Sequence, residues 1–189
     1  MDAPLVRPGH TYEDLLAAST RGNPCELFNG ELLESPVPTL PHQRTAQRLA
    51  RAFEEALRDG SRVAAAPVDV ILAPDTVARP DLVLVLADHL AIVGQAREGG
   101  LAVRGAPDLI LEVLSPATVR LDRVIKMDAY ARYSVPEFWL ADGTAKLIEI
   151  FRLDRHAQLY RLTGTCGPGD RATTPLVPGL AVEVGRLFG

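Results

Sequence analysis

Residues 107–116 place one acidic residue, Glu112, inside an apolar run that begins just after Asp108. A run of this length and composition is typical of a strand buried on both faces, as in a sheet covered by helices. An ionised carboxylate is rarely buried unless it is paired or binds a metal ion. The run therefore predicts a central strand in which Glu112 has a partner.

A helical pattern follows this strand, with Ser115 or Thr118 as its candidate N-cap. One broad apolar face is expected to cover the sheet, and it contains Val119, Leu121, Ile125, Ala129, Tyr130 and Tyr133. Asp122, Lys126 and Tyr130 recur every four residues on that same face, which predicts a charged pair directed at the strand of Glu112. An ordinary Asp122–Lys126 ion pair along the helix explains the same spacing, so both interpretations stay open.

Lysine is rare in this chain. Of its 20 basic residues, only Lys126 and Lys146 are lysines. A lysine retained on an inward face indicates a need for a compact ammonium group, which the planar guanidinium of arginine does not replace.

The composition indicates an ordinary soluble protein of one domain spanning residues 1–189. Hydrophobic residues make up 47% and charged residues 23% of the chain. A formal charge of −4 excludes a global attraction to nucleic acid or to an anionic membrane, but it allows a local basic groove. Cys25 and Cys166 are too few for a disulfide framework, and we find neither a signal-peptide pattern nor an apolar run that spans a bilayer. We therefore expect a cytoplasmic location and no membrane partner.

The N-terminal half is predicted to hold a short helix over residues 11–19, a hairpin over residues 25–34 with its turn at Asn29-Gly30, and a helix over residues 42–58. His42 extends the apolar stripe of the longer helix, so it either faces inward near the sheet edge or packs locally. A separate basic stripe on this helix comprises Arg44, Arg48, Arg51 and Arg58. This stripe either contacts phosphates or is a solvated face.

The remaining strands are expected over residues 63–72 with an interruption at Pro67, over residues 79–86, and over residues 136–142. Residues 87–106 are predicted to form a short helix or loop, and residues 146–152 and 158–162 a peripheral antiparallel pair. The fold class predicted is α/β, with a mixed central sheet flanked by helices and a peripheral antiparallel hairpin.

Asp81 and Glu112 stand on two strands predicted to be neighbours in the sheet. Two such carboxylates can hold a divalent ion with hard oxygen ligands, and Lys126 is the candidate ammonium that stabilises charge or orients water. Asp108 competes for a ligand position, but it precedes Glu112 by four residues, about 13 Å along a strand, so we favour a role for it in capping the strand entrance.

These residues together resemble a known family. The matching motifs are Arg79-Pro80-Asp81, residues 107–116, the series Asp122, Lys126 and Tyr130, residues 135–142, the hairpin at Asn29-Gly30-Glu31-Leu32, His42, and Pro178-Gly179-Leu180. The pattern is similar to the Uma-two family of the PD-(D/E)xK nuclease superfamily, and the similarity extends from about Tyr12 to the C-terminal Leu-Phe. The resemblance implies a restriction-endonuclease-like fold.

The sequence departs from the superfamily pattern at one position. Leu114 stands where the pattern has lysine, and the resemblance to members with a displaced lysine implies that Lys126 replaces it from the following helix. The catalytic residues implied are Asp81, Glu112 and Lys126, with Asp81 and Glu112 as ligands of Mg²⁺ or Mn²⁺. Candidate supporting or substrate-contacting residues are Glu31, His42, Asp108, Asp122 and Tyr130.

The function implied is metal-dependent hydrolysis of nucleic acid phosphodiester bonds, with DNA favoured and a homodimer expected. The alternative is a catalytically inactive dimeric interaction module that retains the nuclease fold. In that alternative, Phe138-Trp139 and the antiparallel pair at residues 146–162 are candidate interface segments, and ordinary membership of the core is the other interpretation of both.

Overall fold

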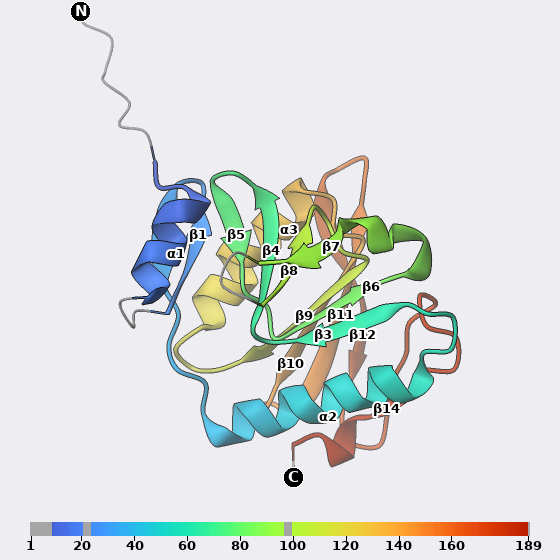
Figure 1. Cartoon of the computed structure of the whole chain (residues 1–189). Helices are drawn as coiled ribbons and strands as arrows, with labels where there is room; N and C mark the ends of the chain where they lie inside the picture. The colour runs from blue at the N-terminus through green and yellow to red at the C-terminus, as the bar shows by residue number, and fades with distance from the viewer. Residues whose placement is uncertain (1–8, 21–23, 97–99, 189) are drawn as a thin grey trace, which may run out of the picture.

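The computed structural model describes residues 9–20, 24–96 and 100–188, which form two mixed β-sheets and a few helices (Figure 1). Sheet A has the order β2 (Glu31–Glu34), β1 (Cys25–Phe28), β5 (Thr76–Ala78), β4 (Val68–Ala73), β8 (Leu101–Arg104) and β7 (Val93–Gln95). Sheet B has the order β12 (Leu159–Cys166), β11 (Leu147–Asp154), β10 (Glu137–Asp142), β9 (Leu109–Leu114), β6 (Leu82–Val85) and β3 (Arg62–Ala65). Two short strands, β13 (Arg171–Ala172) and β14 (Val182–Glu183), pair separately.

The helices lie on different sides of the sheets. Helix α1 (Tyr12–Thr20) packs on the outer side of sheet A, and α2 (Leu40–Ala56) runs along the lower edge of Figure 1 against one face of sheet B. The helix after β9 contains a π-helical segment η2 (Leu121–Lys126) that continues directly into α3 (Met127–Arg132). Two 3₁₀ segments complete the secondary structure: η1 (Ala87–Ile92) and η3 (Val184–Arg186).

Strand β9 is buried on both faces, as its apolar run predicts. Leu109, Leu111 and Val113 pack with α2 and the C-terminal segment, whereas Ile110 and Leu114 pack with α3 and sheet A. Side chains alternate along a strand, so Glu112 lies on the second of these faces, between the two sheets. This alternation directs Glu112 at the helix that carries Lys126.

The structure confirms the predicted fold class and the hairpin β1–β2, whose residues Asn29 and Gly30 both have positive φ. It also confirms the peripheral antiparallel pair, which is β11–β12 at one edge of sheet B. No helix in the described part of the chain is long and apolar enough to cross a membrane.

Three local expectations were wrong. The expected strand at residues 63–72 is two strands in different sheets, because the chain leaves sheet B at Ala66–Pro67 and enters sheet A at β4. The segment 87–106 contains the expected short helix, as the 3₁₀ segment η1, but it also contains the short strands β7 and β8, although its glycines favoured a loop. Val119 is 40% exposed instead of buried, because it precedes the π-helical turn that aligns the inward residues.

Phe138 and Trp139 are fully buried on opposite faces of β10. Phe138 packs against Tyr130 and Trp139 against Phe53, with edge-to-face ring contacts. These two residues therefore belong to the core and cannot form the interface that the alternative function assigned to them.

Candidate active site

Lys126 lies at the centre of a buried cluster of carboxylates. Its Nζ is 2.9 Å from Glu26 Oε1, 3.1 Å from Glu112 Oε1 and 3.3 Å from Asp122 Oδ1. All four side chains are at most 4% exposed. Burial alone would lower the pKa of Lys126, but the three carboxylates outweigh it and raise that pKa well above its ordinary value. The ammonium group therefore stays protonated inside the protein.

The π-helical segment brings Asp122 and Lys126 to the same side. Residues four apart are offset by about 40° in an α-helix, and the wider turn of a π-helix, with its i→i+5 bonding, leaves them at a similar offset in the opposite sense, so in either case they share one side. The side chains of Asp122 and Lys126 are consequently directed into the cluster. The α-helix that follows places Tyr130 on the same side. The predicted stacking of these three residues towards Glu112 is thus observed, and the ion pair along the helix exists in addition to it.

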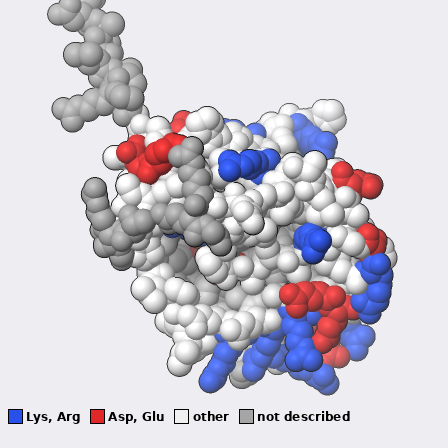
Figure 2. Space-filling model, viewed as in Figure 1, with Lys and Arg blue, Asp and Glu red and all other residues white. Residues whose placement is uncertain are grey.

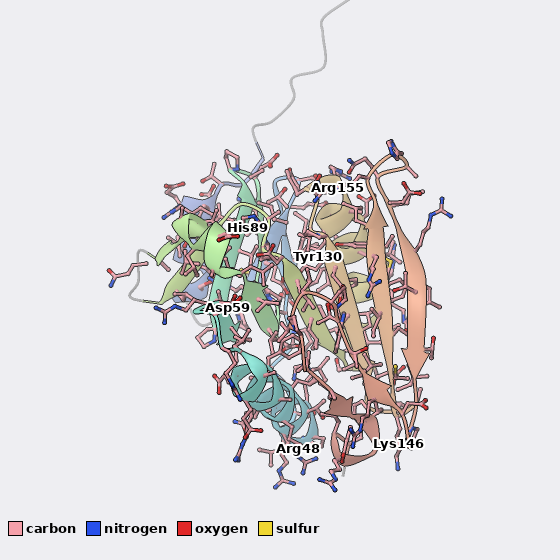
Figure 3. The ribbon with its side chains drawn as sticks, turned by 90° about the vertical axis from the view of Figure 1, so that its right-hand side faces the viewer. Arg48, Asp59, His89, Tyr130, Lys146 and Arg155 are labelled. Atoms are coloured by element: carbon pink, nitrogen blue, oxygen red, sulfur yellow. The ribbon has the colours of Figure 1, made fainter. Side chains whose placement is uncertain are left out.

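Glu112 shares its Oε1 between two donors. Tyr130 donates from Oη at 2.7 Å and Lys126 donates from Nζ at 3.1 Å. Burial raises the pKa of Glu112 well above its ordinary value; Lys126 opposes this rise, and Asp122, Asp81 and Glu26 add to it. Figure 3 shows Tyr130 deep in the molecule beside the strands of sheet B. The burial of several like charges beside one lysine means that a further cation would be stabilised here.

Asp81 stands next to Glu112 because β6 pairs antiparallel with β9. Leu82 faces Leu111 in this register, so Asp81 precedes the strand at the level of Glu112. Its Oδ2 accepts the Val113 N–H at 2.7 Å and lies 3.2 Å from His42 Nε2. Burial lowers the pKa of His42, but the hydrogen bond and charge of Asp81 outweigh this and raise it. His42 therefore faces inward at the sheet edge.

Glu26 belongs to the cluster, and our sequence analysis did not select it. Its Oε1 also accepts the Ser35 hydroxyl at 3.0 Å, and its Oε2 accepts the Arg79 backbone N–H at 2.9 Å. Arg79 lies two residues before Asp81, where the chain crosses from sheet A to sheet B, so Glu26 holds this crossing in place. The sequence does contain a feature that indicates Glu26. It is a lone carboxylate in the short apolar strand 25–28, and the same feature identified Glu112.

The cluster forms one wall of a cavity of about 700 Å³. Beside the carboxylates, the lining is mostly small apolar side chains, contributed by Pro36, Val37, Pro67, Leu101, Pro116 and Ala117 among others. A second polar network lines the cavity at Arg79, whose Nε donates to Asp69 Oδ1 at 2.8 Å, while Tyr12 donates to the other oxygen of Asp69 at 2.7 Å. A volume of this size is typical of a ligand site.

Two predicted supporting residues lie outside the cluster. Asp108, at the other end of β9, accepts the Leu86 N–H at 2.8 Å and lies 2.7 Å from His89 Nδ1. This agrees with the favoured interpretation that it caps the strand entrance. Glu31 is exposed on β2 at the outer edge of sheet A and does not line the cavity.

The residues fit a divalent cation by the chemistry of their oxygens. Glu26, Glu112 and Asp122 surround the single lysine and Asp81 lies next to Glu112, so carboxyl groups outnumber the lysine in this buried place. Within the described residues, no three His, Cys, Asp or Glu side chains form a ready metal-binding group. Mg²⁺ is often bound through only one or two carboxylates and several waters, so two carboxylates such as Asp81 and Glu112 would be enough to hold such an ion.

A family model described as "Uma2: Putative restriction endonuclease" matches residues 10–185. The chain belongs to the Uma2 family. Among solved structures, this Uma2 chain is similar to a crystal structure titled as a putative nuclease belonging to DUF820 from Anabaena variabilis, with a TM-score of 0.71 and 15% sequence identity. The match covers 88% of this chain and 90% of that one, and it establishes the restriction-endonuclease-like fold. No curated protein matches.

Proposed function

We propose that this protein is a metal-dependent endonuclease that hydrolyses phosphodiester bonds of DNA, with the cavity beside Lys126 as its active site. The observation that carries the proposal is the meeting of Lys126, from the helix, with Glu112 of β9 beside Asp81, at the wall of a 700 Å³ cavity. The family and the fold support a nuclease, and the chemistry of the oxygen ligands supports a divalent ion.

Asp81 and Glu112 would hold the ion, Mg²⁺ or Mn²⁺, which when bound supplies a Lewis acid towards the scissile phosphate. His42 keeps Asp81 oriented through the contact of Nε2 with Oδ2, and the Val113 N–H fixes the same oxygen. Tyr130 fixes Glu112 by donating a hydrogen bond from its hydroxyl group to Oε1. Hydrolysis adds one water across a P–O bond, and preorganised cations at the site stabilise the negative charge that develops on the phosphate.

Lys126 supplies this positive charge from within the protein. Glu26 Oε1 and Asp122 Oδ1 lie 2.9 Å and 3.3 Å from its Nζ, so they would keep the ammonium group protonated and fixed if Glu112 held a cation. We therefore assign Glu26 and Asp122 as residues that position Lys126, and Lys126 as the group that orients the attacking water or contacts the phosphate.

The test is cleavage of supercoiled plasmid and single-stranded DNA by the purified protein in Mg²⁺, Mn²⁺ or EDTA. We expect metal-dependent cutting that Glu112→Gln and Lys126→Met each abolish, while Lys146→Met, on an exposed turn, leaves it unchanged. Cutting that survives Lys126→Met would remove the lysine from the mechanism and keep the nuclease. Absence of both cutting and metal binding would favour the inactive interaction module.

We further propose that two copies of the single domain assemble, with β12 as the surface that joins them. This strand is an eight-residue edge of sheet B, and Leu159 and Leu162 on it are 62% and 53% exposed. Long exposed strand edges readily pair with another chain. Sedimentation analysis of the protein and of Leu159→Glu/Leu162→Glu tests this, since the charged variant should be monomeric and a dimer that persists would contradict the assignment.

A further inference from the structure

Helix α2 carries its charges in an order opposite to the one that the helix dipole favours. Residues 40–51 of this helix include Arg44, Arg48 and Arg51 and no acidic residue, whereas its last turn contains Glu54 and Glu55 and no basic residue. The dipole favours acidic groups near the positive N-terminal end and basic groups near the C-terminal end. Helix stability therefore does not explain this arrangement of charges.

These three arginines form an exposed row along the helix. Arg44 and Arg51 are separated by two helical turns, so they lie on one side of α2 about 10 Å apart. Both are exposed, as are Gln43 and Gln47 beside them. Arg48, between them, has its guanidinium fixed by the carbonyl of Leu187 at 2.7 Å. Lys and Arg side chains gather along the lower edge of the molecule in Figure 2, where Figure 1 shows α2.

This row begins at the mouth of the candidate active site. Thr39, which caps α2, and His42, in its first turn, both line the cavity. The chain as a whole has a net charge of −4 and the cavity wall is rich in carboxylates, so a polyanion needs a local positive surface to approach it. The row is placed to provide that surface, and it leads away from the cavity for about three base-pair steps of duplex length.

The existing partners of these arginines do not prevent such contacts. Arg51 pairs with Glu55 at 2.7 Å, but the two side chains are 79% and 65% exposed, and ion pairs between such exposed groups are weak. A phosphate can therefore replace Glu55 as the partner of Arg51. Arg44 is exposed at the end of the row nearer the cavity.

The chemistry of this surface favours a duplex over a single strand. Among the described residues, neither the exposed side of α2 nor the cavity lining carries Phe, Tyr or Trp. Single-strand binding without sequence preference relies on stacking of bases on aromatic side chains, whereas a rigid row of cations suits a regular phosphate backbone.

We propose that the exposed side of α2, through Arg44 and Arg51, binds the phosphate backbone of double-stranded DNA next to the phosphate held in the cavity. This assignment rests on the proposed nuclease function, which it extends by naming the surface that holds the substrate.

The experiment measures the affinity of a fluorescent 20-base-pair duplex by anisotropy from 50 to 200 mM salt. Every protein carries Glu112→Gln, so that cleavage does not consume the probe. Arg44→Gln/Arg51→Gln is compared with Arg132→Gln/Arg155→Gln, which changes the net charge equally at two exposed residues outside α2, β12 and the cavity, in α3 and in the β11–β12 turn; Figure 3 shows Arg155 at the opposite end of the molecule from Arg48. Circular dichroism checks that each variant is folded.

We expect the α2 variant to lose between about tenfold and a hundredfold in affinity at 100 mM salt, and its slope of log affinity against log salt to fall by about 2. The control variant should keep the affinity and the slope of its parent. Equal losses in both variants, or no loss in the α2 variant, would overturn the proposal. Displacement of the duplex by polyglutamate at the same charge concentration would also overturn the proposal, because it would indicate an acidic protein partner instead.

A separate measurement keeps this proposal distinguishable from the nuclease assignment. Hydrolysis of bis(p-nitrophenyl) phosphate with Mn²⁺, a substrate too small to extend from the cavity along α2 to Arg51, is compared between the native protein and Glu112→Gln. Hydrolysis that Glu112→Gln abolishes, together with unaltered DNA binding by the α2 variant, refutes the surface alone. A specific loss of DNA binding without any hydrolysis refutes the nuclease and keeps the surface.

Discussion

Replacement of Lys126 by methionine should destabilise the protein strongly. The substitution keeps a long side chain of similar shape but leaves Glu26, Glu112 and Asp122 buried without their shared cation. Removal of one partner from a buried ion pair costs about 3–5 kcal/mol. For a domain of this size each kcal/mol lowers the melting temperature by about 2–4 °C, so we expect a decrease of roughly 6–20 °C.

The assay is urea unfolding followed by the fluorescence of Trp139, the single tryptophan, which is fully buried against Phe53. Lys146→Met is the matched control, because Lys146 is the only other lysine and is exposed on a turn. The control should change the free energy of unfolding by less than about 0.5 kcal/mol.

The loss caused by Lys126→Met should also depend on pH. Burial raises the pKa of Glu112 and of Asp122, and the charge of Lys126 opposes both shifts, so the variant raises these pKa values further. A carboxyl group whose folded pKa is raised contributes stability below its unfolded pKa, near 4, and loses it as the pH rises through the folded pKa. The destabilisation should therefore be smaller at pH 5 than at pH 8. A loss below about 1 kcal/mol, or one equal at both pH values, would refute the argument that three ionised carboxylates depend on this lysine.

Three other predictions follow from single contacts. Glu26→Gln should lower kcat for plasmid cleavage at least tenfold while the Mg²⁺ affinity measured by calorimetry stays within about twofold, because Glu26 contacts Lys126 and is not an expected metal ligand; an equal loss of metal affinity would contradict this. Tyr130→Phe removes a hydrogen bond to a buried carboxylate and should cost about 1.5–3 kcal/mol of unfolding free energy, and a cost near zero would show that the bond is dispensable. Burial, aided by the bond to Asp69, raises the pKa of Tyr12 to about 12, so this group contributes stability that is present below pH 10 and is lost as the pH rises to 12. Unfolding curves of Tyr12→Phe should accordingly show less loss than the native protein over this interval, and parallel losses would exclude that assignment.

Local patterns were sufficient to predict most helices and strands. Alternating or continuous apolar residues predicted which segments are buried, and Asn29-Gly30 predicted the first hairpin. The same patterns identified Glu112 as a buried carboxylate in need of a partner, and the four-residue spacing identified Lys126 as that partner. Burial pattern and residue spacing depend on neighbours along the chain, so both can be predicted from the sequence.

The division of the strands between two sheets did not follow from local pattern. The residues of β3 and β4 read as one interrupted strand, because apolar content is the same whichever sheet a strand joins. Glu26 was missed for a similar reason: nothing in its own strand indicates its partner, and only the packing of sheet A against the helix of Lys126 brings its carboxylate to 2.9 Å from Nζ.

The sequence by itself determined which residues are chemically anomalous: a buried acid at Glu112, an inward lysine at Lys126 and a row of arginines on α2. The tertiary structure alone decided that Glu26 joins Glu112 and Lys126, and that the row of arginines begins beside the cavity. The physical reason is the distance along the chain over which each effect acts. Burial and periodicity act over a few residues, whereas the meeting of charges from separate strands and helices depends on how the two sheets pack and where the π-helical turn rotates its side chains.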